Sequence, residues 1–217
     1  RNTECHFLGI TYNFIKSYLS LMTANYLKTL LSPTARALQT FDGSRELYAN
    51  MEANATNGDD RLTSREATFI MQRNSFYMAS VTDDGWPYVQ HRGGPAGFLT
   101  VLDERTLAFA DYRGNRQYIS TGNARANARV ALILMDYVRQ ARLKIFATVE
   151  LLPSGPDSDL ADQVLTPGYR ARPERIVLLH LVAFDWNCPQ HITPRFTEAE
   201  IIETMRGVRE RLSGLED

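Results

Sequence analysis

The sequence is poor in cysteine, with only Cys5 and Cys188 among 217 residues. Two cysteines cannot build the disulfide framework of a small secreted domain, so we expect a reducing, cytoplasmic environment. No stretch reaches the roughly 20 continuous apolar residues that a membrane-spanning helix needs. Neither sign of charge is in excess, with 24 basic and 25 acidic residues, whereas a general nucleic-acid binder shows a basic surplus. The sequence therefore predicts neither a membrane span nor a nucleic-acid partner.

The composition is that of an ordinary globular protein, with 44% hydrophobic and 23% charged residues. The length is sufficient for one domain with a sizeable core. Residues 1–21 differ from the rest, because an initiator Met is missing and Met22 begins a more typical protein start. Polar residues interrupt any apolar core of a signal peptide in this stretch. We expect residues 1–21 to be a non-native or disordered leader, and a cleaved targeting segment is the alternative.

Helix signals occur at both ends of the chain. Pro33 follows Ser32 as a proline does at a helix start, and Asp42-Gly43 separates this helix from a second one over 44–53. Residues 22–60 are therefore predicted to form an N-terminal helical segment. Thr63-Ser-Arg-Glu66 and Thr197-Glu-Ala-Glu200 have the form of capping boxes. They predict a short helix over 64–72 and a C-terminal helix within 197–217.

The central part of the chain changes to the alternating pattern of β-strands. Turn signals recur about every ten residues, and this spacing predicts a closed antiparallel barrel with helices at its ends. The expected strands cover 76–82, 86–92, 98–102, 106–111, 130–137, 142–152 and 175–184. Two short helices are expected at 115–122 and 159–165.

An arginine-rich turn follows the strand at 106–111. Arg113, Gly114, Asn115 and Arg116 are placed in the first turn of the expected helix, where free backbone N–H groups and guanidinium groups suit a phosphate dianion. Arg92 is expected to reach the same phosphate from the neighbouring strand. The alternative is that these arginines are solvated turn residues that contribute little.

Four segments together resemble the FMN-binding split barrel of the pyridoxamine 5′-phosphate oxidase superfamily, and in particular its flavin-nucleotide-binding subgroup. They are Asp84–Arg92, Asp111–Gln117, Asn123–Leu134 and Phe184–Arg195. The resemblance covers about 61–196. Two departures distinguish the chain from the oxidase itself: Gln117 stands where the family usually has Lys, and Gln190-His-Ile-Thr-Pro-Arg195 replaces an Arg-x-His substrate segment.

The resemblance implies a mainly β fold, a six-stranded antiparallel split β-barrel with Greek-key-like order and flanking helices, over residues 61–196. It further implies a homodimer with FMN at the subunit interface. On the strand at 86–92, alternation places Gln90 and Arg92 on one face and His91 on the other. Arg142 and Lys144 likewise share a face and either contact the flavin or form a solvent-facing basic pair. The expected cofactor-binding residues are Gln90, Arg92, Asp111, Tyr112, Arg113, Asn115, Arg116, Gln117, Arg142, Lys144, Trp186, Gln190 and Arg195.

The function implied by the resemblance is that of an FMN-dependent oxidoreductase related to pyridoxamine 5′-phosphate oxidase, with a small-molecule substrate or electron donor. A flavin-binding or sensing module without turnover is the alternative, as is haem or a deazaflavin on the same barrel. No catalytic residue is predicted. No metal site is predicted either, because Cys188 and His191 supply only two ligands; the roles of these two residues and of His91 stay open.

Overall fold

The structure is a computed structural model, and it describes residues 24–54, 60–153, 159–166, 168–186 and 190–213. The prediction of a leader at 1–21 and the questions about Cys188 fall outside these residues. Among the described helices, no helix is long and apolar enough to cross a membrane.

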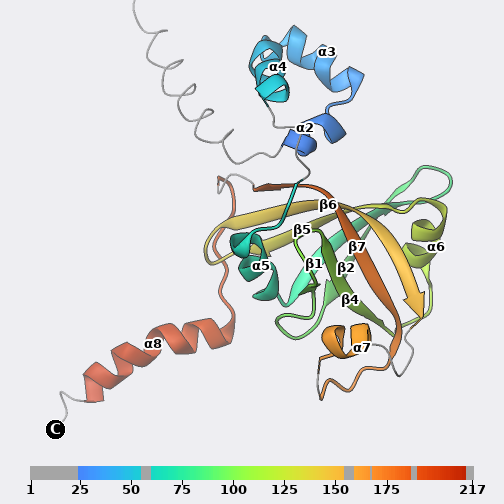
Figure 1. Cartoon of the computed structure of the whole chain (residues 1–217). Coiled ribbons are helices and arrows are strands. Elements are labelled where there is room, and N and C mark those ends of the chain that lie inside the picture. The colour runs from blue at the N-terminus through green and yellow to red at the C-terminus, as the bar shows by residue number, and fades with distance from the viewer. Residues whose placement is uncertain (1–23, 55–59, 154–158, 167, 187–189, 214–217) are drawn as a thin grey trace, which may run out of the picture.

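Seven antiparallel strands form one sheet in the order β2-β1-β5-β6-β7-β4-β3. The sheet curls around a common interior, and α5, α6 and α7 lie along its margin (Figure 1). The strands are β1 (Ser75–Val81), β2 (Pro87–Gly93), β3 (Thr100–Val101), β4 (Thr106–Tyr112), β5 (Arg129–Asp136), β6 (Ala141–Pro153) and β7 (Pro173–Trp186).

This architecture confirms the antiparallel split barrel with flanking helices and corrects two details. The sheet has seven strands, as the sequence pattern predicted, and not the six that the resemblance implied; the strand expected at 98–102 is only the two-residue β3. Among the described residues, β2 and β3 each pair with one neighbour only, so hydrogen bonding does not close the barrel.

The core lies inside the curled sheet, and strand alternation produces it. Phe76 and Met78 of β1 point inward, as do Leu143 and Ile145 of β6, and all four are at most 3% exposed. The Phe76 ring packs on Phe98 with ring centroids 5.5 Å apart. Burial of each large apolar side chain stabilises the fold by roughly 1.5–3 kcal/mol.

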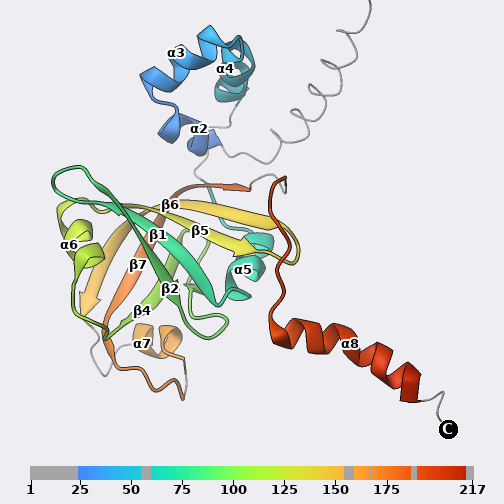
Figure 2. The same ribbon diagram turned by 180° about the vertical axis from the view of Figure 1, so that it is seen from behind.

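Seven helices are described, and the sequence signals of several are confirmed. The helices are α2 (Ala24–Leu30), α3 (Pro33–Phe41), α4 (Arg45–Asn54), α5 (Ser64–Met71), α6 (Ile119–Ala126), α7 (Asp159–Val164) and α8 (Glu198–Ser213). The side chain of Ser32 caps α3, and Thr63 and Glu66 form the expected capping box of α5. Thr197 and Glu200 bond reciprocally at the start of α8. The α8 helix extends away from the sheet in both views (Figures 1 and 2).

The expected helix at 115–122 is wrong at its start. The α6 helix begins at Ile119, four residues later than predicted. Arg116 and Tyr118 adopt left-handed backbone conformations, with φ of 62° and 53°, and a right-handed helix cannot run through such residues. Residues 113–118 therefore form a loop, and the arginines of this loop are not in a first helical turn.

Candidate functional site: an arginine-rich cleft

A cleft with a cavity volume of about 70 Å³ lies where β2, the end of β4, the loop at 113–118 and the start of α6 meet. This volume is well below the roughly 300–1,000 Å³ of a site that encloses a whole small molecule, so the cleft fits a single charged group such as a phosphate. Most of the lining side chains are polar or charged. The lining residues are Tyr88, Gln90, Arg92, Asp111, Tyr112, Gly114, Asn115, Arg116, Gln117, Tyr118, Ile119, Ser120, Thr121 and Glu174.

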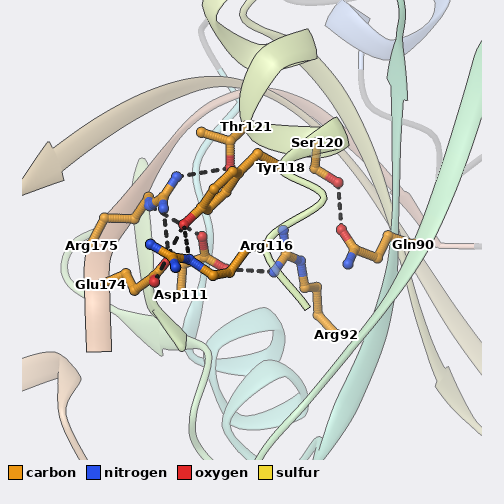
Figure 3. A network of polar contacts seen from close by, with 9 residues as sticks. All are labelled: Gln90, Arg92, Asp111, Arg116, Tyr118, Ser120, Thr121, Glu174 and Arg175. Carbon is orange, nitrogen blue, oxygen red and sulfur yellow. Dashed lines mark hydrogen bonds and ion pairs between the residues drawn. The ribbon is translucent and has the colours of Figure 1, made fainter. Parts of the chain in front are cut away.

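Asp111 bridges two arginines at the centre of the cleft (Figure 3). Its carboxylate oxygens lie 2.6 Å from Arg92 Nη1 and 3.4 Å from Arg175 Nε. Arg175 also contacts the Glu174 carboxylate at 2.9 Å and donates to Thr121 Oγ1 at 3.0 Å. Asp111 is only 8% exposed, so these charge-assisted contacts fix the positions of both guanidinium groups.

Arg92 retains unused hydrogen-bonding capacity. Its Nε is buried and has no hydrogen-bond partner among the described residues, although Nη1 is engaged by Asp111. Its guanidinium group lies over the Phe109 ring at 5.6 Å. A buried donor without a partner is costly, and an anionic ligand in the cleft would relieve that cost.

A bulge places two consecutive residues in the cleft lining. Neighbours along a strand normally face opposite sides, but the register of β4 on β7 shifts between Asp111 and Tyr112, and both residues line the cleft. The Tyr112 ring contacts the Tyr169 ring edge-on at 5.1 Å. Burial and the nearby Tyr169 raise the pKa of Tyr112, so its hydroxyl stays protonated at neutral pH.

The loop at 113–118 is held by side-chain contacts across its own turn. Arg116 Nε donates to the Tyr118 hydroxyl at 3.2 Å, and this hydrogen bond raises the pKa of the Arg116 guanidinium. The guanidinium of Arg175 lies over the Tyr118 ring at 5.1 Å. Asn115 Oδ1 accepts from the Gln117 backbone N–H at 3.2 Å. These contacts present the Arg116 guanidinium at the exposed side of the cleft.

The opposite wall comes from β2 and α6. Ser120 Oγ donates to Gln90 Oε1 at 2.5 Å, which links the helix start to the strand. Gln90 and Arg92 both line the cleft, whereas His91 lies on the exposed face beside the Tyr77 ring at 5.5 Å. The prediction that Gln90 and Arg92 share a face without His91 is therefore confirmed.

The structure gathers part of the expected site residues. Seven of them line the cleft: Gln90, Arg92, Asp111, Tyr112, Asn115, Arg116 and Gln117. Arg113 is exposed and lies outside the lining. The remaining five are Arg142, Lys144, Trp186, Gln190 and Arg195, and they lie away from the cleft within this chain.

Those five residues have other surroundings. Lys144 contacts Asp185 at 3.1 Å and Tyr26 of α2 at 2.9 Å, and Arg142 shares its face of β6. Trp186 is a core residue, 7% exposed, whose indole N–H donates to Glu66 at 2.6 Å. The Arg195 guanidinium lies over the Tyr137 ring at 4.9 Å, and Gln190 is exposed.

Some residues in or beside the cleft were not predicted from the sequence. The most important of them are Arg175 and Glu174. Arg175 is the register partner of Asp111 across β4 and β7, and 63 intervening residues hide this pairing in the sequence. Tyr88 would follow from the alternation that identified Gln90. Ser120 and Thr121 would follow from a helix placed four residues later.

The arginines of the cleft suit a phosphate group. Arg92 and Arg116 line the cleft together with the carboxylates of Asp111 and Glu174, and Arg175 pairs with both carboxylates from beside the lining. The mostly polar lining fits the phosphate end of a nucleotide better than a flat aromatic ring. In the part of the chain that the structure describes, no three His, Cys, Asp or Glu residues cluster as metal ligands would.

Comparisons with known proteins place the chain in a family. The family model described as pyridoxamine 5′-phosphate oxidase matches residues 62–179, more than half of the chain. No curated protein matches significantly. Similar solved structures include a Lactobacillus delbrueckii protein provisionally assigned as a pyridoxamine 5′-phosphate oxidase, which is 26% identical with a TM-score of 0.45 over 59% of this chain and 96% of that one.

Two further structures show the range of proteins with this likeness. An F420 reductase is 23% identical with a TM-score of 0.39, over 54% of this chain and 93% of the reductase. An FMN-binding protein from Syntrophomonas wolfei is 12% identical with a TM-score of 0.39, over 68% of this chain and 96% of that protein. The family match, its extent along the barrel and the antiparallel split-barrel fold agree with one another: the chain is a member of the pyridoxamine 5′-phosphate oxidase family.

Proposed function

We propose that the chain binds FMN with the phosphate in the arginine-rich cleft and acts as an FMN-dependent oxidoreductase. The observation that carries the proposal is the buried Arg92 Nε, which lacks a partner among the described residues and belongs to a side chain that lines the cleft beside Arg116. Membership of the pyridoxamine 5′-phosphate oxidase family supports a phosphorylated ligand.

Each cleft residue has a distinct task in this proposal. Arg92 and Arg116 bind the phosphate, and the ion pair with Asp111 holds the Arg92 guanidinium in place. Gln117, which stands where the family usually has Lys, offers an amide donor in place of a charge. The Ser120–Gln90 hydrogen bond joins the two walls of the cleft. Bound FMN would supply hydride and electron transfer through its ring system.

The ring of the cofactor needs a surface that the polar cleft does not offer. We place it at the interface of a homodimer, as the family resemblance implies. Gln190 and Arg195 are exposed in one chain and remain candidates to contact the cofactor of a partner. Trp186 does not, because it is buried against Phe69 and Glu66.

The phosphate assignment is tested by titrating FMN into the purified chain and following the quenching of flavin fluorescence. Arg116→Ala removes one charge-assisted contact to the phosphate, and we expect an increase in the FMN Kd of roughly tenfold or more. The matched control is Arg125→Ala, which removes an exposed arginine of α6 outside the cleft and leaves the Kd unchanged. An unchanged Kd in Arg116→Ala, or an equal loss in both variants, contradicts the assignment.

Turnover is tested separately from binding. With the FMN-loaded chain, NADPH should bleach the visible flavin absorbance, and air should restore it. FMN binding with no bleaching by NADPH or NADH would favour a flavin-binding or sensing module over an oxidoreductase.

A further inference from the structure

We propose that a second anionic group of the pyrophosphate type is bound by Arg113, Arg170 and Arg172, which we call the cationic rim. The inference deepens the proposed function, because the rim lies next to the cleft that holds the FMN phosphate in that proposal. The second group belongs either to a longer dinucleotide cofactor or to a nicotinamide dinucleotide that donates electrons.

The cationic rim is built from two loops that are tied together. The Arg113 backbone N–H donates to the Arg172 carbonyl oxygen at 2.9 Å, just beyond the point where Tyr112 pairs with Pro173. Below this link, the rings of Tyr112 and Tyr169 are in contact at 5.1 Å. Because Tyr112 also lines the cleft, the rim adjoins the cleft directly.

The rim arginines differ from the other arginines around the cleft. The side chains of Arg113, Arg170 and Arg172 are exposed, and none of them forms a hydrogen bond or ion pair with another described residue. Arg92 and Arg175, in contrast, both have carboxylate partners. The two carboxylates that could compensate the rim, of Asp111 and Glu174, are therefore already engaged.

The surplus of positive charge is a local feature. The whole chain has a net charge of −1, yet six arginines and two carboxylates gather at the cleft and its rim: Arg92, Arg113, Arg116, Arg170, Arg172 and Arg175 against Asp111 and Glu174. A local excess of one sign of charge attracts ligands of the opposite sign.

A single phosphate does not account for the rim. The cleft arginines suffice for one dianion, so the three rim arginines would be superfluous for FMN alone. Guanidinium forks bind paired phosphate oxygens in bidentate fashion, and a pyrophosphate offers several such pairs. The alternative, three solvated arginines that bind nothing, predicts no anion affinity at the rim.

The test uses inorganic pyrophosphate as the probe, with calorimetric titration of the full chain in phosphate-free buffer. The variant Arg170→Gln/Arg172→Gln should bind pyrophosphate about tenfold or more weakly than the wild type. Arg125→Gln/Arg129→Gln removes the same charge from exposed arginines elsewhere and should bind like the wild type. Equal affinity in the rim variant and the wild type, or an equal loss in the control, overturns the proposal.

Two further arms separate this inference from the proposed function. Arg116→Ala should lose FMN affinity but keep most of its pyrophosphate affinity, whereas the rim variant should do the opposite. If the wild type binds pyrophosphate through the rim but does not bind FMN, the proposed function is refuted and the proposed pyrophosphate site is retained.

Titrations with FAD and NADPH identify the source of the second anionic group. Weaker binding of FAD by the rim variant than by the wild type assigns this group to the cofactor, and weaker binding of NADPH assigns it to the electron donor. Unchanged affinity for both refutes the ligand assignment.

Discussion

Asp111→Asn is the substitution from which the structure predicts the largest change in the cleft. The carboxylate is 8% exposed and contacts Arg92 at 2.6 Å and Arg175 at 3.4 Å. An amide has nearly the same shape, but it leaves both guanidinium groups without their shared counter-charge. Removal of one partner from a fully buried ion pair costs about 3–5 kcal/mol.

The expected cost here is smaller than that range. The side chains of Arg92 and Arg175 keep 17% and 16% exposure, so water screens them in part, and Arg175 retains Glu174. We therefore expect Asp111→Asn to lower the free energy of unfolding by about 2–3 kcal/mol. With a urea m value of about 2 kcal/mol/M, the unfolding midpoint falls by about 1 M or slightly more.

The assay is urea unfolding followed by circular dichroism, with and without inorganic phosphate. Phosphate that fills the space between the arginines should stabilise Asp111→Asn by about 1.4 kcal/mol at ten times the variant's Kd. The wild type, which keeps the carboxylate in that space, should be stabilised less at the same phosphate concentration. Asp83→Asn makes the same chemical change at an exposed turn and should change the free energy of unfolding by less than about 0.5 kcal/mol. An Asp111→Asn midpoint equal to that of the wild type would refute the reasoning.

Two other predictions concern the core and the outer face of the sheet. Burial acts to raise the pKa of Glu66, but hydrogen bonds from Thr63 and Trp186 outweigh it and hold the pKa below its usual 4.5. The ionised Glu66 therefore stabilises the fold fully at pH values above its usual pKa, and this stabilisation is lost as the pH falls through the lower pKa of the folded protein. Glu66→Gln should lower the free energy of unfolding by about 1–3 kcal/mol at pH 7, and this loss should become smaller in acid. The measurement is urea unfolding at several pH values, followed by Trp186 fluorescence in a Trp86→Phe background. A loss of stability that does not change with pH would contradict the prediction. Lys144→Met removes the cation that pairs with Asp185, which is 2% exposed, and should lower the free energy of unfolding by about 3 kcal/mol in chemical denaturation. The double variant Lys144→Met/Asp185→Leu should regain most of that loss. A double variant no more stable than Lys144→Met would argue against the pairing.

The local features of the fold could be predicted from the sequence because their causes are local. The capping boxes at Thr63 and Thr197 each need only four consecutive residues, and both form as expected. Alternation along β2 is equally local, and it placed Gln90 and Arg92 correctly on one face. Turns about every ten residues were enough to indicate an antiparallel barrel, whereas the open, split form of that barrel was implied by the family resemblance.

The parts of the site that were missed depend on information that a short window does not contain. Arg175 meets Asp111 only because β4 and β7 pair, and the sequence separation hides that pairing. The start of α6 was misplaced because Gly114-Asn115 resembles a helix start, whereas left-handed residues at 116 and 118 postpone the helix. The resemblance implied a cofactor contact for Trp186, but its indole packs in the core against Phe69 and donates a hydrogen bond to Glu66.

The backbone at Arg116 has an evolutionary consequence. A side-chain-bearing residue with φ of 62° costs roughly 1–2 kcal/mol that glycine would not. Selection for heat resistance alone should therefore drift toward glycine at this position and discard the guanidinium group with it. Variants evolved at high temperature should keep Arg116 when ligand binding is also selected and should replace it with glycine when it is not. The residue at position 116 therefore indicates whether the cleft is under selection for ligand binding.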